Sequence, residues 1–177
     1  MSDALVLVGL SGSGKSTVAR LAAARLGLAH YDTDRLIEEH AGSPVSGLFA
    51  SRGEEAFREL EEAAIAEACA RSGVVAVGGG AVLRAANRLH MREGNLVVWL
   101  DTPPAILAAR LAHHTQGEER PLLRGNLDAR MLALWYERRA SYALTAHLRV
   151  PHQQGGSSGS HATAQRIAGI FTAWRDA

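Results

Sequence analysis

A glycine-rich loop near the N-terminus constrains the fold of this chain more than any other stretch. Residues 9–16 read G-L-S-G-S-G-K-S and match the phosphate-binding pattern G-x-x-x-x-G-K-[ST] without a mismatch. An apolar run over residues 4–8 precedes the loop and is typical of a strand. Apolar residues at helical spacing follow the loop until Gly27. The sequence therefore predicts a strand, a phosphate-binding loop and a helix in succession.

This loop has the chemistry of a site for nucleotide phosphates. Its glycines let backbone N–H groups converge on phosphate oxygens, and the start of the helix adds partial positive charge. Lys15 can bridge the β- and γ-phosphates, and the Ser16 hydroxyl can bind Mg²⁺. Lys15 is the only lysine among 19 basic residues, and a planar guanidinium cannot replace a compact ammonium among phosphates. The alternative is a chance glycine and serine turn, which the flanking strand and helix patterns argue against.

The overall composition restricts the kinds of partner and compartment. The 177 residues fit one domain over 1–177, with 47% hydrophobic and 21% charged residues. A formal net charge of +1 does not favour binding to nucleic acid or to an anionic membrane. Cys69 is the only cysteine, so no intramolecular disulfide can form, and no Cys/His cluster indicates zinc. No signal peptide or membrane-spanning stretch is evident, so we expect a cytoplasmic protein.

Short apolar strands alternate with helical patterns along the chain. Such alternation is typical of βαβ units, so we expect an α/β fold with a five-stranded parallel sheet covered by helices on both sides. Further strands are predicted at residues 28–31, 74–77, 96–100 and 147–150. Helices are predicted at residues 36–42, 45–49, 54–71, 85–92, 106–111, 127–140 and 162–174, with a break at 52–53. Loops are predicted at residues 113–126 and, as a flexible Gly/Ser segment, at 155–160.

Several polar or glycine motifs fall at the carboxyl ends of predicted strands, where parallel α/β sheets bind their ligands. They are the phosphate-binding loop, Asp32 with Asp34, the triple glycine at residues 78–80, and Asp101. We therefore expect most of them to face one cleft. The polar stretch at about 113–125 is predicted to be a lid, because long loops inside compact domains are often functional.

Two acidic and basic motifs each allow two interpretations. Asp32 and Asp34 lie two residues apart after a strand, so their carboxylates point the same way and can hold Mg²⁺ and orient an acceptor hydroxyl. The alternative is a helix N-cap with an acid in the first turn. Arg58 lies three residues before Glu61 on a predicted helix, within reach of it, and its guanidinium matches a carboxylate in bidentate fashion. The alternative is a solvated helix face with ordinary ion pairs to Glu54 and Glu62.

The remaining candidates are weaker one by one. Residues 78–80 have no side chains, so their backbone N–H groups can meet a ligand, or they form only a tight turn. Arg120, in the predicted lid, can stabilise charge on a transferring phosphoryl group, or it is a surface arginine. Either Arg138 or Arg139 can clamp an anionic substrate.

Taken together, these motifs resemble the shikimate kinases, P-loop enzymes of the nucleoside-monophosphate-kinase-like group. The resemblance covers about residues 4–150. It depends on six motifs in the family's order: the loop at 9–16, D-x-D at 32–34, F-R-x-x-E at 57–61, G-G-G at 78–80, R-P-L-L at 120–123 and E-R-x-x-x-Y at 137–142. It implies an α/β P-loop kinase fold, a lid at about 113–125 and a substrate-binding segment at about 33–61. The implied activity is ATP-dependent phosphorylation of the shikimate 3-hydroxyl by a monomer.

The resemblance also implies roles for the matching positions. The ATP phosphates would be bound by Gly12, Ser13, Gly14, Lys15, Ser16 and Thr17. Mg²⁺ would be held by Ser16 and Asp32. Shikimate would be bound by Asp34, Arg58, Gly79, Gly80 and Arg138, with Glu61 holding Arg58 in place. The catalytic groups would be Asp34, which orients or deprotonates the attacking hydroxyl, Lys15, and Arg120, which closes with the lid. Arg110 would pack on adenine.

The sequence departs from the family pattern near its C-terminal end. The usual N-P-L-Y reads R-A-S-Y at residues 139–142, and His147 stands where Asp is common. The adenine-contacting loop is replaced by a Gly/Ser-rich segment at 151–160. Two alternative functions remain at this point. The first is a related kinase that acts on gluconate or a nucleoside monophosphate, and the second is a nucleotide-binding module without catalysis. The F-R-x-x-E and triple-glycine motifs argue against the first, and the intact catalytic residues argue against the second.

Overall fold

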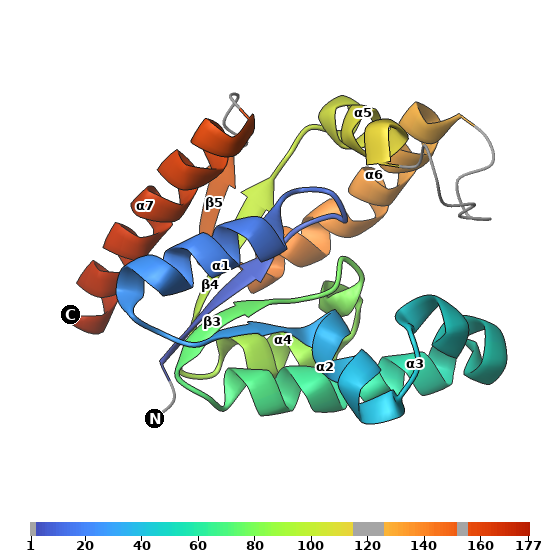
Figure 1. The fold of residues 1–177 in the computed structure, drawn as a ribbon, viewed down its shortest axis with the longest axis horizontal. Helices are drawn as coiled ribbons and strands as arrows, with labels where there is room; N and C mark the ends of the chain where they lie inside the picture. The colour runs from blue at the N-terminus through green and yellow to red at the C-terminus, as the bar shows by residue number, and fades with distance from the viewer. Residues whose placement is uncertain (1–2, 115–125, 152–155) are drawn as a thin grey trace.

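The computed structural model of the chain is organised around one parallel β-sheet (Figure 1). The structure describes residues 3–114, 126–151 and 156–177. The strands are β1 (Ala4–Val8), β2 (His30–Asp32), β3 (Gly73–Ala76), β4 (Leu96–Asp101) and β5 (Leu148–Pro151). Their order in the sheet is β2-β3-β1-β4-β5, and every neighbouring pair is parallel. The predicted five-stranded parallel sheet is confirmed.

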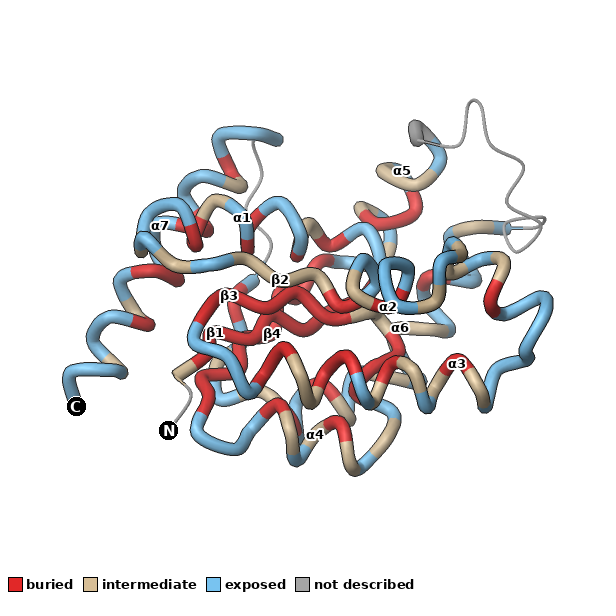
Figure 2. The backbone as a smooth tube through the Cα atoms, turned by 60° about the horizontal axis from the view of Figure 1, so that its bottom comes forward, coloured by how far each residue is buried: buried red, intermediate tan, exposed pale blue. Residues whose placement is uncertain are grey.

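Helices cover both faces of this sheet. They are α1 (Lys15–Leu26), α2 (Thr33–Ala41), α3 (Val45–Cys69), α4 (Ala85–Arg92), α5 (Pro104–His114), α6 (Leu127–Thr145) and α7 (Gly156–Arg175), with a 3₁₀ turn, η1 (Ala81–Leu83). None of the helices in the described ranges is both long enough and apolar enough to span a bilayer. Figure 2 shows the central strands as the most buried part of the backbone.

Alternate residues of β1 divide the core into two layers. Leu5 and Leu7 pack with the helices α1 and α7, for example against Phe171. Val6 and Val8 point to the opposite face and pack with α3, α4 and α6, for example against Ile65. All five β1 residues are buried, as expected for a central parallel strand covered on both sides.

The predicted break at residues 52–53 is a kink inside α3. Gly53 has φ 79° and ψ 173°, a conformation that is essentially limited to glycine. The two parts of α3 are joined through this residue, so the predicted short and long helices form one bent element (Figure 1). A small separate core of Ile37, Leu48, Phe57 and Ala64 binds α2 to both parts of α3.

Two predicted boundaries near the C-terminus are wrong. The helix α7 already begins at Gly156, so the segment predicted as a flexible loop is helical from there on. Gly159 is buried in the packing of α7, and Thr163 Oγ1 donates a hydrogen bond to the Gly159 carbonyl at 2.8 Å. Tertiary packing therefore overrides the low helix propensity of glycine and serine. The helix α6 continues to Thr145, since buried Tyr142 and Thr145 hold its last turn in the core.

Candidate active site

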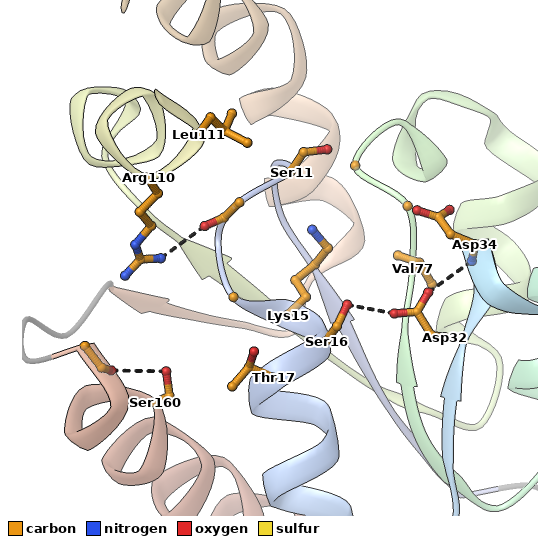
Figure 3. A pocket seen from close by; sticks show the side chains of 15 residues that line it. Ser11, Lys15, Ser16, Thr17, Asp32, Asp34, Val77, Arg110, Leu111 and Ser160 are labelled. Carbon is orange, nitrogen blue, oxygen red and sulfur yellow. Dashed lines mark hydrogen bonds between the residues drawn. The ribbon is translucent and has the colours of Figure 1, made fainter. Parts of the chain in front are cut away.

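A polar cleft of about 510 Å³ lies at the carboxyl ends of β1, β2 and β3 (Figure 3). Residues from the phosphate-binding loop, the β2–α2 junction, the glycine run, α5 and the first turns of α7 meet there. The lining residues are Ser11, Gly12, Gly14, Lys15, Ser16, Thr17, Asp32, Asp34, Val77, Gly78, Gly79, Arg110, Leu111, Gly156 and Ser160. The predicted phosphate-loop residues, apart from the buried Ser13, thus share one cleft with the Asp32/Asp34 pair.

The phosphate-binding loop curls around the side chain of Lys15. A Cβ on Gly9 would lie 2.6 Å from the Leu100 carbonyl oxygen, so only glycine fits where the loop leaves β1. Lys15 Nζ donates hydrogen bonds to the Gly9 and Leu10 carbonyl oxygens at 2.8 and 2.9 Å. Burial lowers the pKa of Lys15 to about 8, although the negative charges of Asp34 and Asp32 oppose this shift. The ammonium is therefore held inside the loop, where phosphate oxygens would favour its charged form.

Ser16 and Asp32 form a pair suited to Mg²⁺. The Ser16 hydroxyl donates to Asp32 Oδ2 at 2.7 Å, while Asp32 Oδ1 accepts the backbone N–H of Asp34 at 3.1 Å (Figure 3). Asp32 is thus the N-cap of α2 and Asp34 is the acid of its first turn, and the capping interpretation holds together with the cleft interpretation. Among the described residues, no group of three or more His, Cys, Asp or Glu side chains is arranged to hold a metal ion by itself. Mg²⁺ commonly uses one or two carboxylates with substrate phosphates, so this donor set fits the ion.

Asp34 faces the same cleft from the start of α2. Burial raises the pKa of Asp34 to about 6, and the negative charges of Asp32 and Glu61 add to the rise while Lys15 opposes it. A Cβ on Gly78 would lie 3.0 Å from both Asp34 Oδ1 and Glu61 Oε1. The first glycine of the run therefore lets the backbone pass between two carboxylates.

Arg58 lies against the last glycine of the run. Its Nη1 donates to Glu61 Oε2 at 2.8 Å, and its Nη2 donates to Glu54 Oε1 at 3.2 Å. A Cβ on Gly80 would lie 2.7 Å from Nη1 and 2.9 Å from Nη2. The Arg58 side chain is only 13% exposed, so the interpretation of a solvated helix face is wrong, although its predicted ion pair with Glu54 is present. The other partner in that interpretation, Glu62, pairs with Arg84 instead.

Tyr142 connects α6 to the same glycine run. Its hydroxyl donates to the Gly79 carbonyl oxygen at 2.6 Å, and its ring stacks on Trp99 with centroids 5.5 Å apart. Burial raises the pKa of Tyr142, and the positive charge of Arg138, one helical turn away, opposes this shift. Arg138 is 17% exposed, and its side chain interacts with the Tyr142 hydroxyl that contacts Gly79.

Arg139 points elsewhere. Its guanidinium lies over the rings of Trp135 and Tyr136, 5.1 and 5.2 Å from their centroids. Of the two arginines that the sequence left open, Arg138 is the one beside the glycine run.

Two predicted candidates lie at the edge of the cleft or outside it. Arg110 lines the cleft, and its Nη1 donates to the Gly12 carbonyl oxygen at 3.1 Å. Asp101, expected at the same sheet edge, instead accepts hydrogen bonds from Trp135 Nε1 at 3.2 Å and Arg149 Nε at 2.8 Å. It joins β4 to β5 and α6 and does not line the cleft. Arg120 and most of the predicted lid lie outside the described residues.

Sequence reasoning missed several residues of the cleft. Ser11 packs on the glycine run, since a Cβ on Gly79 would lie 3.0 Å from the Ser11 nitrogen. Gly156 and Ser160 line the cleft from α7 because that helix begins earlier than predicted. The sequence signal for Gly156 and Ser160 was the difference from the family pattern at residues 151–160.

Comparisons with known proteins point to one family. The family model described as shikimate kinase matches residues 11–168. A shikimate kinase of Symbiobacterium thermophilum is 48% identical over 149 residues, 82% of this chain and 84% of the relative. One of Moorella thermoacetica is 42% identical over 175 residues, 98% of this chain and 97% of the relative.

Solved structures extend the likeness to the fold. A shikimate kinase from Acinetobacter baumannii in complex with shikimate has a TM-score of 0.87 and 31% identity, covering 98% of this chain and 94% of its own. A shikimate kinase from Aquifex aeolicus has a TM-score of 0.79 and 27% identity, covering 96% of this chain and 98% of its own. Sequence and fold agree over nearly the whole length, and the chain belongs to the shikimate kinase family.

Proposed function

We propose that this chain transfers the γ-phosphoryl group of ATP to the 3-hydroxyl of shikimate. The site would have a phosphate end, which binds the ATP phosphates, and a carboxylate end, which binds the carboxylate of the acceptor. The observation that carries the proposal is the placement of Lys15 and Asp34 in the cleft that the glycine run borders. Arg58 contacts that run from α3, and Tyr142 contacts it from α6 beside Arg138. A kinase acting on a small hydroxy acid needs both ends.

At the phosphate end, the backbone of residues 12–17 would bind the ATP phosphates. Lys15 Nζ would exchange the Gly9 and Leu10 carbonyls for phosphate oxygens, which favour its charged form. Ser16 and Asp32 would hold Mg²⁺. Bound Mg²⁺ supplies neutralisation of charge on the phosphate oxygens. Arg110 and Arg120 are proposed to contact the nucleotide, Arg110 from α5 and Arg120 from the predicted lid at 113–125.

At the acceptor end, Asp34 would accept the proton of the shikimate 3-hydroxyl. The hydroxyl oxygen then bonds to the γ-phosphorus, and the bond from that phosphorus to the β–γ bridging oxygen breaks. The products are shikimate 3-phosphate and ADP, and the proton is left on Asp34. A pKa of about 6 leaves this carboxyl ionised near neutral pH and able to take a proton. Positioning and charge stabilisation supply most of the rate in such transfers.

The remaining acceptor contacts would fix the orientation of the ring. Arg58 and Arg138 are proposed to bind the shikimate carboxylate, with Glu61 orienting Arg58 through the 2.8 Å ion pair. The backbone of Gly79 and Gly80 would meet the ring hydroxyls. We further propose that the enzyme acts as a cytoplasmic monomer without nucleic acid or membrane partners, in keeping with a formal net charge of +1.

The proposed activity is tested by measuring ADP release with ATP and Mg²⁺. Shikimate, gluconate and the nucleoside monophosphates are supplied in turn as acceptors. Release that depends on shikimate is expected. Release with another acceptor alone, or no release with any acceptor, would replace this proposal with one of its rivals.

The two-arginine carboxylate site makes a sharper prediction. Arg138→Met keeps much of the aliphatic stem, and Arg58→Met combined with Glu61→Gln removes the buried ion pair without leaving a buried carboxylate unpaired, since Glu54 is exposed. Each variant should raise the KM for shikimate at least about tenfold, since a hydrogen bond to a charged group contributes roughly 1.5–3 kcal/mol. The KM for ATP should stay nearly unchanged.

The control for this prediction is an acceptor in which a carboxamide replaces the carboxylate. It should be poor with the wild-type enzyme and lose little more in either variant. Losses of equal size with the carboxamide would mean that the arginines do not share a carboxylate.

A further inference from the structure

Arg58 makes ion pairs with two carboxylates of very different exposure. The Glu61 side chain is 2% exposed and accepts from Nη1 at 2.8 Å. The Glu54 side chain is 70% exposed and accepts from Nη2 at 3.2 Å. Glu61 is enclosed by protein and cannot leave, whereas Glu54 lies at the surface. We propose that Glu54 occupies the ligand side of Arg58 in the substrate-free enzyme, and that the carboxylate of the acceptor displaces it.

The surroundings of Arg58 leave Glu54 as the exchangeable partner. The backbone of Gly80 lies against both terminal nitrogens, with a hypothetical Cβ only 2.7 and 2.9 Å from them. Glu61 closes a second side. A ligand carboxylate that seeks a bidentate grip needs adjacent N–H groups of the guanidinium, and Glu54 holds one of its two terminal nitrogens. The carboxylates of Glu54 and of the acceptor therefore compete for the same N–H donor of Arg58.

The backbone permits Glu54 to be released. Glu54 directly follows Gly53, whose φ of 79° and ψ of 173° mark the kink of α3, and a Cβ on Gly53 would meet no atom within 4 Å. The Glu54 side chain is itself 70% exposed, so it can turn towards solvent without displacing protein atoms. An ion pair with one exposed partner is weak, so a ligand that also contacts Arg138 can displace it.

A plainer account is that Glu54 is an acid in the first turn after the kink, where the helix dipole favours negative charge. Glu55 occupies the same turn but pairs with Arg84, which lies between η1 and α4. The helix dipole explains an acid at this place. The i,i+4 spacing explains why Glu54, of these two, contacts the arginine proposed to bind substrate. This spacing accounts for the contact in the substrate-free enzyme, and the experiment tests whether the acceptor displaces it.

The experiment compares Glu54→Gln with Glu59→Gln, which makes the same charge change at an exposed position of α3. Glu54→Gln should lower the KM for shikimate about two- to fivefold, the range expected from losing an exposed ion pair. Glu54→Ala, which removes both oxygens, should lower it at least as much. Titration calorimetry should give the same change in the Kd for shikimate, without turnover. The KM for ATP should stay the same, as should the Kd for the carboxamide acceptor.

An unchanged or raised KM for shikimate in both Glu54 variants would overturn the inference, because Glu54 would then be neutral or would help to hold Arg58. An equal fall in Glu59→Gln would also overturn it, since the effect would be long-range charge. An equal gain for the carboxamide acceptor would do so too.

The inference rests on the proposed role of Arg58, and the two can fail separately. If Arg58→Met with Glu61→Gln leaves the KM for shikimate unchanged, the proposed carboxylate site fails. If that variant raises the KM as expected but neither Glu54 variant lowers it, only the competition by Glu54 fails.

Discussion

Burial brings the pKa values of Lys15 and Asp34 closer together. The pKa of Lys15 falls to about 8 and that of Asp34 rises to about 6. In both cases the shift disfavours the charged form, and the opposite charge of the other residue limits it. The phosphate loop thus holds an ammonium whose charge depends on nearby anions. The binding of phosphate and the charge of Asp34 should therefore both change the pKa of Lys15.

The pKa of Lys15 can be measured directly, because the chain has no other lysine. With ¹³C-labelled lysine, the Cε resonance should titrate with a midpoint near pH 8 in the free enzyme. Asp34→Asn should move the midpoint lower, because the charge of Asp34 raises the pKa of Lys15. ADP should move it higher, because phosphate oxygens favour the ammonium.

Asp128→Asn, at an exposed position in the first turn of α6, is the matched control and should leave the midpoint of Lys15 unchanged. A midpoint near the ordinary value for lysine in the free enzyme would contradict the enclosed position of Lys15. An upward shift in Asp34→Asn would contradict the coupling between the two residues.

At the scale of elements, α3 carries the acceptor side of the site on a bent helix. The kink at Gly53 separates a first part that packs on α2 through Leu48 from a second part that carries Arg58 and Glu61. The bend depends on a backbone conformation that residues with a Cβ rarely adopt. The stability of α3 should therefore respond in opposite ways to alanine at its two glycines.

Gly53→Ala should lower the free energy of unfolding by roughly 1–3 kcal/mol, because a Cβ strains the backbone at this φ and ψ. Gly47→Ala, in the first part of the same helix, should raise it by roughly 0.5–1 kcal/mol, since alanine is the better helix former. Its Cβ would meet Pro44 Cγ at 3.7 Å, an ordinary contact. Urea unfolding measures both values. Changes of the same sign would show that the kink is not a glycine-dependent conformation.

The elements that the sequence predicted well are those with uninterrupted periodic patterns. The strand β1 and the helix α4 have the predicted bounds because apolar spacing and flanking glycines define them locally. The start of α7 at Gly156 was not predictable in this way, since glycine and serine there are helical only because Gly159 packs into the protein. Local propensity is a weak guide where tertiary contacts decide.

The same distinction applies to the site. Ser16 and the Asp32/Asp34 pair were predicted as site residues because each belongs to a short motif with fixed spacing. The hydrogen bond from Tyr142 to Gly79 joins residues 63 positions apart, so spacing could not reveal it. The separation of Asp101 from the cleft depends on Arg149 of the last strand, which comes 48 positions later. Long-range pairings of this kind become visible only in the folded chain.

At the scale of the whole molecule, nucleotide binding at the carboxyl end of β1 should stabilise the fold. The phosphate loop connects β1 to α1, and α1 packs on α7, so ligand contacts at the loop reach the core layer on that face. A ligand that binds only the folded state adds RT ln(1 + [L]/Kd) to the free energy of unfolding.

ADP with Mg²⁺ at about one hundred times its Kd should add roughly 2.7 kcal/mol. For a chain of this length that gain raises the Tm by about 5–11 °C in a calorimetric scan. Lys15→Arg at the same ADP concentration should show almost no shift, because a guanidinium does not fit the enclosed place of the ammonium. Equal shifts in both proteins would mean that the nucleotide binds away from the phosphate loop.

The crowded glycine run also determines how this enzyme can be redesigned. A Cβ at the three successive positions would meet Asp34 and Glu61, then Ser11, then Arg58. A mutant library that varies residues 78–80 to accept bulkier acceptors would therefore consist mainly of damaged proteins. The helices α2 and α3 pack together on a separate small core that does not include the glycine run. Directed evolution of acceptor choice should therefore vary exposed positions of these helices and leave the glycines fixed.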